Sequence, residues 1–212
     1  MSANFDNLLV TLNESINKVD VLALEETKLT KTKLELSAQF QIEGFVSLHV
    51  IRNTGFGGGT ACYIKDINKV EQTEVKIHEC ESTYVTLSLG NTLVMFILII
   101  YRPPRNNLMC FVSSLDSFLS SLIDEKIVIG DLNIDNLKKN YTANRYLIGI
   151  FSNGFSSQIN KPTREEYLLG NLCVACLDHI HVEGPLQNIK SYVVSCKVSD
   201  HNLVASMIKN TF

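Results

Sequence analysis

The sequence predicts an α/β sandwich, in which two packed sheets are flanked by helices. Apolar patterns mark more strands than helices, and neighbouring strands are joined both by short turns and by helical crossovers. The longest apolar run, Leu93–Tyr101, is typical of a strand buried on both faces. At this chain length we expect one domain, spanning residues 1–212.

The individual elements follow from the spacing of apolar residues. Between Leu8 and Val19 the spacing is helical, and Asn4 can cap that helix. Two more amphipathic helices are predicted, over Phe111–Leu122 and Tyr146–Phe151. The predicted strands are Val19–Leu24, Phe45–Ile51, Thr60–Ile64, Val75–Ile77, Tyr84–Leu89, Leu93–Tyr101, Ile127–Ile129, Leu177–Val182, Ser191–Ser195 and Leu203–Ile208.

Glycines predict two backbone features. Gly90-Asn91 separates two strand patterns, as a hairpin turn does. The cluster Gly55–Gly59 lacks the lysine of a phosphate-binding loop and precedes a strand instead of a helix. We expect this cluster to form a turn or to allow two backbone segments to approach closely.

Composition narrows the functional classes. No apolar run approaches the roughly 20 residues that a membrane-spanning helix needs, so we expect no membrane partner. The first residues lack the pattern of a secretory signal, and without one the six cysteines favour reduced thiols. An intracellular location is therefore expected.

Basic residues gather in one segment. Residues 138–164 carry a charge of +5 and contain no acid, whereas the rest of the chain has 14 basic and 22 acidic residues, a charge of −8. Such a segment can form a surface that attracts a phosphodiester, although a solvated loop face is the alternative. The basic residues are Lys138, Lys139, Arg145, Lys161 and Arg164.

Polar side chains follow apolar runs at four places where strands are expected to end. Because active sites of α/β proteins are built at strand ends, we expect these places to converge. They are Glu25–Lys28, Tyr101–Pro104, Gly130–Asn133 and Ser199–His201.

The residue types suit hydrolysis of a phosphate ester. Asp131 and Asn133 can point the same way, so that the carboxylate accepts a proton from water and the amide donates to a phosphate oxygen. Glu26 offers the hard oxygen ligand that Mg²⁺ prefers. An Asx-rich turn and an ordinary strand-end glutamate are the structural alternatives.

His201 needs a partner from elsewhere in the chain. As neighbours on a strand, Asp200 and His201 point apart. Asp178 is the candidate that fixes the His201 tautomer and raises its basicity, which leaves Asp200 free to face the metal. A surface or capping histidine is the alternative.

Zinc is a less favoured interpretation of a nearby segment. Structural zinc sites usually separate their two ligand pairs by a dozen residues or more, and here the four potential ligands are crowded together. They are Cys173, Cys176, His179 and His181.

In their order along the chain, these segments resemble the endonuclease/exonuclease/phosphatase superfamily, and within it the endonuclease domain of non-LTR retrotransposons. The Glu, Gly-Asp-x-Asn and Ser-Asp-His elements are shared across the superfamily, and the Tyr-Arg-Pro-Pro, glycine-cluster and Pro-Thr-Arg elements point to retrotransposons. The matching segments are Glu26-Thr27-Lys28-Leu29, Gly58-Gly59-Thr60-Ala61, Tyr101-Arg102-Pro103-Pro104, Gly130-Asp131-Leu132-Asn133, Lys161-Pro162-Thr163-Arg164, Leu177-Asp178-His179-Ile180 and Ser199-Asp200-His201.

The resemblance implies a four-layered α/β sandwich of two mixed sheets flanked by helices. It implies a Mg²⁺-dependent enzyme, with Mn²⁺ as an alternative ion, that nicks one strand of double-stranded DNA. The resulting 3′ hydroxyl would prime a reverse transcriptase of the same polyprotein, and the site of action on host DNA would be the nucleus.

The resemblance also implies a role for each matching residue. Glu26 would bind the metal with Asp200 on the same side, and Tyr101 would contact the scissile phosphate. Asp131 and Asn133 would serve water activation and transition-state stabilisation, and Asp178 would orient His201. Residues 163–171 take the place of a hairpin that enters the minor groove and influences target choice.

Two departures from the family pattern matter. Relatives begin with a strand that carries an Asn of the metal site, whereas this chain begins at the following helix, so we expect an amino-terminally shortened domain. Pro104 stands where relatives often have an Asn that touches phosphate. The alternatives are a catalytically weak DNA-binding remnant, or a phosphoesterase acting on a lipid or nucleotide.

Overall fold

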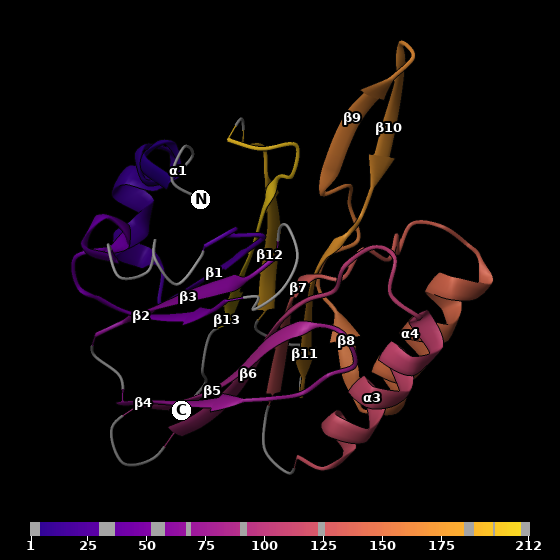
Figure 1. Cartoon of the computed structure of the whole chain (residues 1–212), viewed down its shortest axis with the longest axis horizontal. Helices are drawn as coiled ribbons and strands as arrows, with labels where there is room; N and C mark the ends of the chain where they lie inside the picture. Colours follow the sequence, from indigo (N-terminus) through magenta and orange to yellow (C-terminus); the bar gives the residue numbers. More distant parts are fainter. Residues whose placement is uncertain are drawn as a thin grey trace.

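Two layers of β-strands face each other across an apolar core, and helices cover their outer faces (Figure 1). The structure is a computed structural model that describes residues 5–29, 37–51, 58–66, 69–89, 93–122, 126–184, 189–196 and 198–208. The helices are α1 (Phe5–Leu12), α3 (Leu108–Ser120) and α4 (Tyr141–Ser152), with 3₁₀ helices η1 (Asn13–Lys18) and η2 (Ser37–Phe40).

The larger sheet has six strands. Strands β6 and β7 run parallel and are connected along the chain through the helix α3. All other neighbouring strands of this sheet are antiparallel. The order across the sheet is β4 (Lys69–Glu74), β5 (Glu81–Leu89), β6 (Leu93–Tyr101), β7 (Lys126–Asp131), β11 (Asp178–Glu183) and β8 (Phe155–Ser157).

The second layer consists of two smaller sheets. One has the order β1 (Val21–Glu25), β3 (Thr60–Lys65), β2 (Phe45–Val50), and the other pairs β12 (Ile189–Val194) with β13 (Leu203–Ile208). Among the described residues, β1 pairs only with β3 and β13 only with β12. Each therefore keeps one edge without a hydrogen-bonded neighbour in the described part of the chain.

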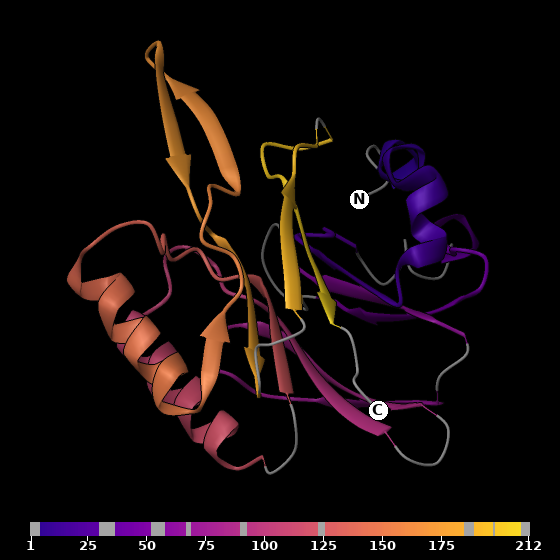
Figure 2. The ribbon, with the colours of Figure 1, turned by 180° about the vertical axis from the view of Figure 1, so that it is seen from behind.

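A long hairpin stands out from the body of the molecule (Figures 1 and 2). It pairs β9 (Arg164–Leu168) with β10 (Asn171–Ala175). Its large apolar side chains are exposed, and Leu169 at the turn is fully exposed. The others are Tyr167, Leu168, Leu172 and Val174.

Three apolar clusters hold the layers together. One packs α3 and α4 on the larger sheet, a second fills the space between the strand layers, and a third packs α1 on the three-stranded sheet. Strand β6 serves two of them, because Leu98 and Ile100 face the helices while Ile97 and Ile99 face the other strand layer. The four-layered α/β sandwich is thus confirmed, as is a β6 buried on both faces.

Some predicted elements differ from the structure. The strand predicted at Val75–Ile77 is wrong: β4 ends at Glu74, and the buried Ile77 enters the core from a loop. Asn4, Gly90-Asn91 and Gly55–Gly57 lie outside the described residues. None of the described helices is long and apolar enough to cross a membrane.

Candidate active site

Two carboxylates meet where β7 ends and β11 begins. The antiparallel register of these strands places Asp131 directly opposite Asp178. One ligand atom from each of these residues and one from His201 lie within 4.8 Å of one another. In the described part of the chain, this is the one group of three or more acidic, histidine or cysteine side chains close enough to share a metal ion.

Asp178 holds His201 by its ring. The Nδ1 atom of His201 lies 3.0 Å and 2.9 Å from the two carboxylate oxygens of Asp178. Burial alone would lower the pKa of His201, but the hydrogen bond and the charge of Asp178 outweigh it and raise this pKa to about 9. The imidazole is therefore mainly protonated at neutral pH, and it can donate a hydrogen bond from Nε2 to an anionic ligand.

Asp131 is buried and carries a perturbed carboxyl group. Its Oδ1 accepts from the backbone N–H of Asn133 at 3.0 Å, and its Oδ2 from Asn133 Nδ2 at 3.3 Å. Burial first, and then the charge of Asp178, raises the pKa of Asp131 to about 7. A carboxyl group that titrates near neutrality can take up and release a proton under physiological conditions.

The backbone brings β6 and β7 unusually close at this point. A side chain on Gly130 would place its Cβ 1.8 Å from the carbonyl oxygen of Ile100, so only glycine fits. The buried Arg102 then links the segments that follow the two strands, because its guanidinium donates to the carbonyl oxygens of Leu132 at 3.1 Å and Asn106 at 2.6 Å. Arg102 thus fixes the backbone directly after Asp131 relative to the segment that follows β6.

Glu26 and Tyr101 form a second part of the site. Glu26 adopts φ +50°, which turns the chain after β1, and its carboxylate accepts a hydrogen bond from the hydroxyl of the buried Tyr101. Burial, followed by this hydrogen bond, raises the pKa of Tyr101, so the phenol keeps its proton.

A glycine allows this turn to pack. A side chain on Gly59 would place its Cβ 2.8 Å from Thr27 Oγ1, and the backbone N–H of Thr27 donates to the Gly59 carbonyl at 3.2 Å. The close backbone approach predicted for the glycine cluster is confirmed at Gly58–Gly59.

Glu25 lies at the end of β1, in the segment Glu25–Lys28 that the sequence pointed to, although no role of its own was predicted for it. Val21 and Ala23 of β1 face the core between the strand layers, and Glu25 follows on the same face. Burial, then the charges of Asp178 and Asp131, raises the pKa of Glu25 to about 8. Predicting the position of Glu25 requires knowing which face of β1 is buried, and the motif at Glu26 does not contain this information.

Thr163 is a second supporting residue. Its side chain is fully buried, and its Oγ1 accepts from the backbone N–H groups of Leu177 at 3.0 Å and Asp178 at 3.1 Å. Its carbonyl accepts from the N–H of Asn202 at 2.6 Å. Thr163 therefore fixes Asp178 and the residue after His201 relative to each other.

Asp200 stands apart from the clustered carboxylates. Its Oδ2 accepts from Arg164 Nε at 2.9 Å, and half of its side chain is exposed. Arg164 also donates to Glu166 at 3.0 Å. The guanidinium is therefore occupied by two acids, and the role of Asp200 as a metal ligand stays a prediction.

The remaining basic residues of the 138–164 segment are exposed. Lys138 and Lys139 lie on the stretch that follows Asp131, with Lys138 Nζ 3.6 Å from Asp135 Oδ2. Arg145 lies on α4, and Lys161 precedes the hairpin. Pro104, at the departure from the family pattern, is exposed after β6.

The fold separates the four side chains that the sequence offered as potential zinc ligands. Cys173 is exposed on the hairpin, while His179 and His181 are buried and contact the hydroxyl of Tyr146, at 3.2 Å and 2.6 Å. These histidines therefore belong to the core beneath α4, in line with the low weight given to zinc.

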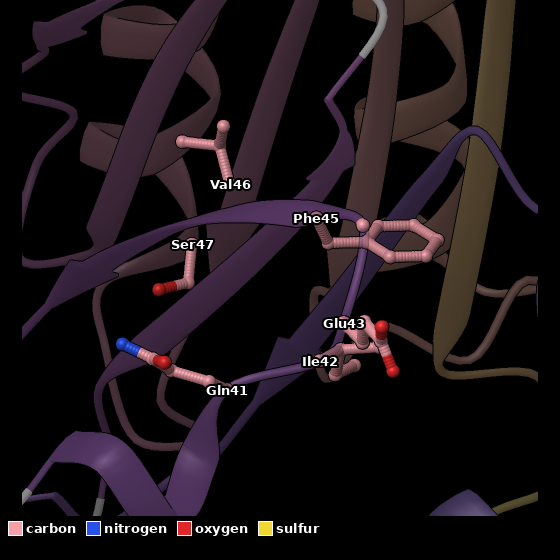
Figure 3. Close-up of a pocket in the computed structure, with 7 residues that line it drawn as sticks. Gln41, Ile42, Glu43, Phe45, Val46 and Ser47 are labelled. Carbon is pink, nitrogen blue, oxygen red and sulfur yellow. The ribbon is translucent and has the colours of Figure 1, made fainter.

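An open depression on the surface lies elsewhere. It is lined by residues 41–47 around the start of β2 (Figure 3). Because β2 and β1 are the two edges of the three-stranded sheet, the depression is on the edge away from Glu25. Its side chains include Gln41, Glu43 and Ser47, and none of the catalytic candidates lines it.

The donor set at the site suits a hard cation. Carboxylate oxygens of Asp131 and Asp178 lie within 4.8 Å of each other at the ends of β7 and β11, and the charge of Glu26 acts on Asp131. Mg²⁺ takes one or two carboxylates while keeping several waters. The site thus combines a pair of carboxylates that would suit a hard cation, a carboxyl that titrates near pH 7 and a protonated imidazole.

Solved structures with the same architecture are known. The endonuclease domain of TRAS1, a telomere-specific non-LTR retrotransposon, superposes with a TM-score of 0.74 at 12% identity, covering 99% of this chain and 93% of that one. An AP endonuclease from Leishmania major gives 0.72 at 14% identity, with 99% and 83% covered.

A third neighbour is described only by its family. It is an endonuclease/exonuclease/phosphatase family protein from Leptotrichia buccalis, with a TM-score of 0.68, 18% identity and coverage of 99% and 94%. No family model matches the chain, and no curated protein matches it. From the sheet order, the layered helices and these superpositions, the chain has the fold of the endonuclease/exonuclease/phosphatase superfamily.

Proposed function

We propose that the chain is a metal-dependent DNA endonuclease that nicks one strand of double-stranded DNA. The observation that carries the proposal is the Asp178–His201 pair placed opposite Asp131. The similarity of the chain's fold to the TRAS1 endonuclease domain points to a non-LTR retrotransposon, whose reverse transcriptase would extend the 3′ hydroxyl.

The clustered side chains supply the groups that hydrolysis of a phosphodiester needs. Asp131 takes a proton from water as the water oxygen bonds to phosphorus, and the bond from phosphorus to the 3′ oxygen breaks. The 3′ oxygen leaves as a hydroxyl, with its proton supplied through solvent. His201, protonated and held by Asp178, donates to a phosphate oxygen that gains negative charge.

Glu26 and Tyr101 serve the other side of the phosphate. Glu26 would hold Mg²⁺ or Mn²⁺, which when bound neutralises charge on a phosphate oxygen. The hydroxyl of Tyr101 donates a hydrogen bond to Glu26, so the phenol is held beside the acid that would bind the ion. The side-chain amide of Asn133 donates to the Asp131 carboxylate and to the Arg102 carbonyl. Asn133 therefore contributes by holding Asp131, the general base, in place.

The surface supplies DNA contacts. Lys138, Lys139 and Lys161 present exposed positive charge near the site, and positive side chains give nucleic-acid binding most of its salt-dependent strength. The hairpin β9–β10 follows Lys161 in the chain and projects from the body of the molecule (Figure 2) with Tyr167 and Leu169 exposed, and apolar side chains of this kind can enter between base steps.

Conversion of supercoiled plasmid to open circle tests the proposal. The purified chain should nick with Mg²⁺ and not with chelator, and Asp131→Ala and His201→Ala should each reduce the rate by about 100-fold or more. Asp116→Ala, an exposed acid on α3, is the control and should nick at the parent rate.

Each outcome has a definite meaning. A mutant of Asp131 or His201 that nicks at the parent rate would remove that residue from the mechanism. A folded parent that binds DNA without nicking it would favour the second candidate, a DNA-binding remnant. Hydrolysis of a nucleotide or lipid phosphodiester with no action on DNA would identify another phosphoesterase.

A further inference from the structure

A chain of hydrogen bonds runs through the core beneath α4, from β8 to the segment that precedes β11. His181 Nδ1 lies 3.0 Å from Ser157 Oγ, and His181 Nε2 lies 2.6 Å from the hydroxyl of Tyr146. The same hydroxyl lies 3.2 Å from His179 Nδ1, and His179 Nε2 lies 3.1 Å from the carbonyl oxygen of Cys176. Tyr146 and both histidines are fully buried.

The chemistry of these groups sets the direction of each bond. A carbonyl can only accept, so the proton of the His179 ring is on Nε2. Burial lowers the pKa of His179 to about 4 and that of His181 well below its usual value, so both rings are neutral at physiological pH and hold one proton each. His179 Nδ1 then accepts from the hydroxyl of Tyr146, whose oxygen accepts from His181 Nε2. His181 Nδ1 in turn accepts from Ser157.

The carbonyl at the end of this chain also joins two parts of the site. Besides the imidazole, the Cys176 oxygen accepts from the backbone N–H of Asn136 at 3.1 Å, and the Cys176 N–H donates to Asp135 Oδ1 at 3.0 Å. The backbone just before Asp178 is therefore tied to the stretch just after Asp131. An imidazole that presented a bare nitrogen to this carbonyl would repel it, because two lone pairs would then face each other.

The side-chain alternation of β11 connects the hydrogen bonds to the site a second time. His179 and His181 point toward Tyr146, so Asp178 and Ile180 point to the opposite face, where Ile180 packs between the strand layers. Holding the two imidazoles therefore also holds the rotation of β11 about its own axis. That rotation decides where the carboxylate at the start of the strand points.

We propose that Tyr146 is a positioning residue of the active site: its hydroxyl joins His181 to His179, and the resulting one-directional chain fixes how β11 presents Asp178 to His201. The inference rests on the proposed function for the reaction that these last two residues serve. Tyr146 touches no reacting group, and it acts only through β11 and the carbonyl at the end of the chain.

The ring nitrogens of the histidines report this arrangement directly. Long-range nitrogen–proton NMR of the parent in metal-free buffer at neutral pH should show His179 and His181 protonated on Nε2. Tyr146→Phe removes only the hydroxyl, and it should shift the ring nitrogen resonances of His201, because the contact of Asp178 with its Nδ1 changes. In plasmid nicking, Tyr146→Phe should lose about tenfold in kcat with KM unchanged.

Tyr63→Phe is the matched control. It also removes a buried hydroxyl, which donates to the carbonyl of Phe40 at 2.8 Å, but it packs against α1 in the three-stranded sheet. Each variant loses one buried hydrogen bond, so both should unfold at lower urea concentration than the parent. Only Tyr146→Phe should also shift His201 and slow nicking. A Tyr146→Phe variant that is less stable but unchanged in both would have a purely structural tyrosine, which overturns the inference.

Two further outcomes bear on the chain itself. A parent in which His179 or His181 is protonated on Nδ1 would overturn the inference, because the bonds would then not run in one direction. If Tyr146→Phe does not fold, Ser157→Ala replaces it, since it removes the first donor of the chain. Shifted His201 resonances in Ser157→Ala support the inference, and unchanged resonances overturn it.

The NMR measurement separates this inference from the proposed function. A parent that nicks no DNA, while Tyr146→Phe shifts the His201 resonances, would keep the positioning role and defeat the nuclease. A Tyr146→Phe variant that nicks at the parent rate with unchanged His201 resonances would keep the nuclease and defeat the positioning role.

Discussion

The pKa of His201 is raised mainly by Asp178, and the charges of Asp131 and Asp200 add to the effect. This pKa is about 9 in the folded chain, against 6.5 for an unperturbed histidine. A histidine with a raised folded pKa stabilises the fold fully below pH 6.5, and this contribution is lost as pH rises through 9. The pKa of Asp131 is raised from 3.8 to about 7, so this carboxyl destabilises the fold increasingly as pH rises from 3.8 to 7. The titrations of Asp131 and His201 are coupled, because each charge acts on the other.

Asp178→Asn should lower the pKa of His201 from about 9 toward 6.5, because the charge that stabilises the imidazolium is removed. NMR titration of the imidazole in metal-free buffer measures the shift. Asp116→Asn on α3 provides a control that should leave His201 unchanged. An unaltered titration in Asp178→Asn would show that the pair does not control the histidine.

For single residues, the sequence predicted a contact correctly where the spacing of residues along a strand determines the direction of their side chains. The divergence of neighbouring side chains on a strand predicted that His201 would find Asp178 and not Asp200, and the structure shows that contact. No role of its own was predicted for Glu25, because its burial depends on which face of β1 points into the core. Thr163 escaped because a hydroxyl that holds two backbone N–H groups leaves no sequence signature.

The contact between β6 and β7 depends on a residue without a side chain. Gly130→Ala should destabilise the fold by roughly 1–3 kcal/mol, since its Cβ would overlap the Ile100 carbonyl, and should also slow nicking by moving Tyr101 relative to Asp131. Urea unfolding measures the first effect and plasmid conversion the second.

Gly149→Ala is the matched control. It lies in α4, where a Cβ would sit at 3.4 Å from Val112 Cγ1 and alanine favours the helix by up to about 1 kcal/mol. Equal stability of the two variants would contradict the steric argument at Gly130.

Elements were predictable where both faces are buried. β6 was evident because every residue from 95 to 100 serves an apolar cluster. β4 was missed because a polar edge strand shows no apolar alternation, and Val75 and Ile77 imitated a strand from the neighbouring loop. The hairpin strands β9 and β10 are mostly exposed, so their pairing has no periodic signal.

Over the whole molecule the net charge is −3, so attraction to DNA depends on where the cations lie. Lys138→Ala combined with Lys139→Ala should weaken binding and reduce the slope of log affinity against log salt by about 1–2. Fluorescence anisotropy over a salt series measures both.

The control pair for this experiment is Lys18→Ala with Lys190→Ala. Both lysines are exposed near the starts of β1 and β12, at strand ends away from the site. A slope that falls equally in both double variants would show that DNA is held without preference for the Lys138–Lys139 surface.

The strand order of the larger sheet also bears on how the protein is made. β11 lies between β7 and β8 although it is synthesised after both, so β8 has no strand to pair with until residue 183 has left the ribosome. Glu26, Tyr101 and Asp131 are synthesised before β8, whereas Asp178 comes with β11 and His201 comes after it. Such long-range pairing is slow to form. A nascent chain therefore cannot assemble the Asp131–Asp178–His201 group before residue 201 has been synthesised.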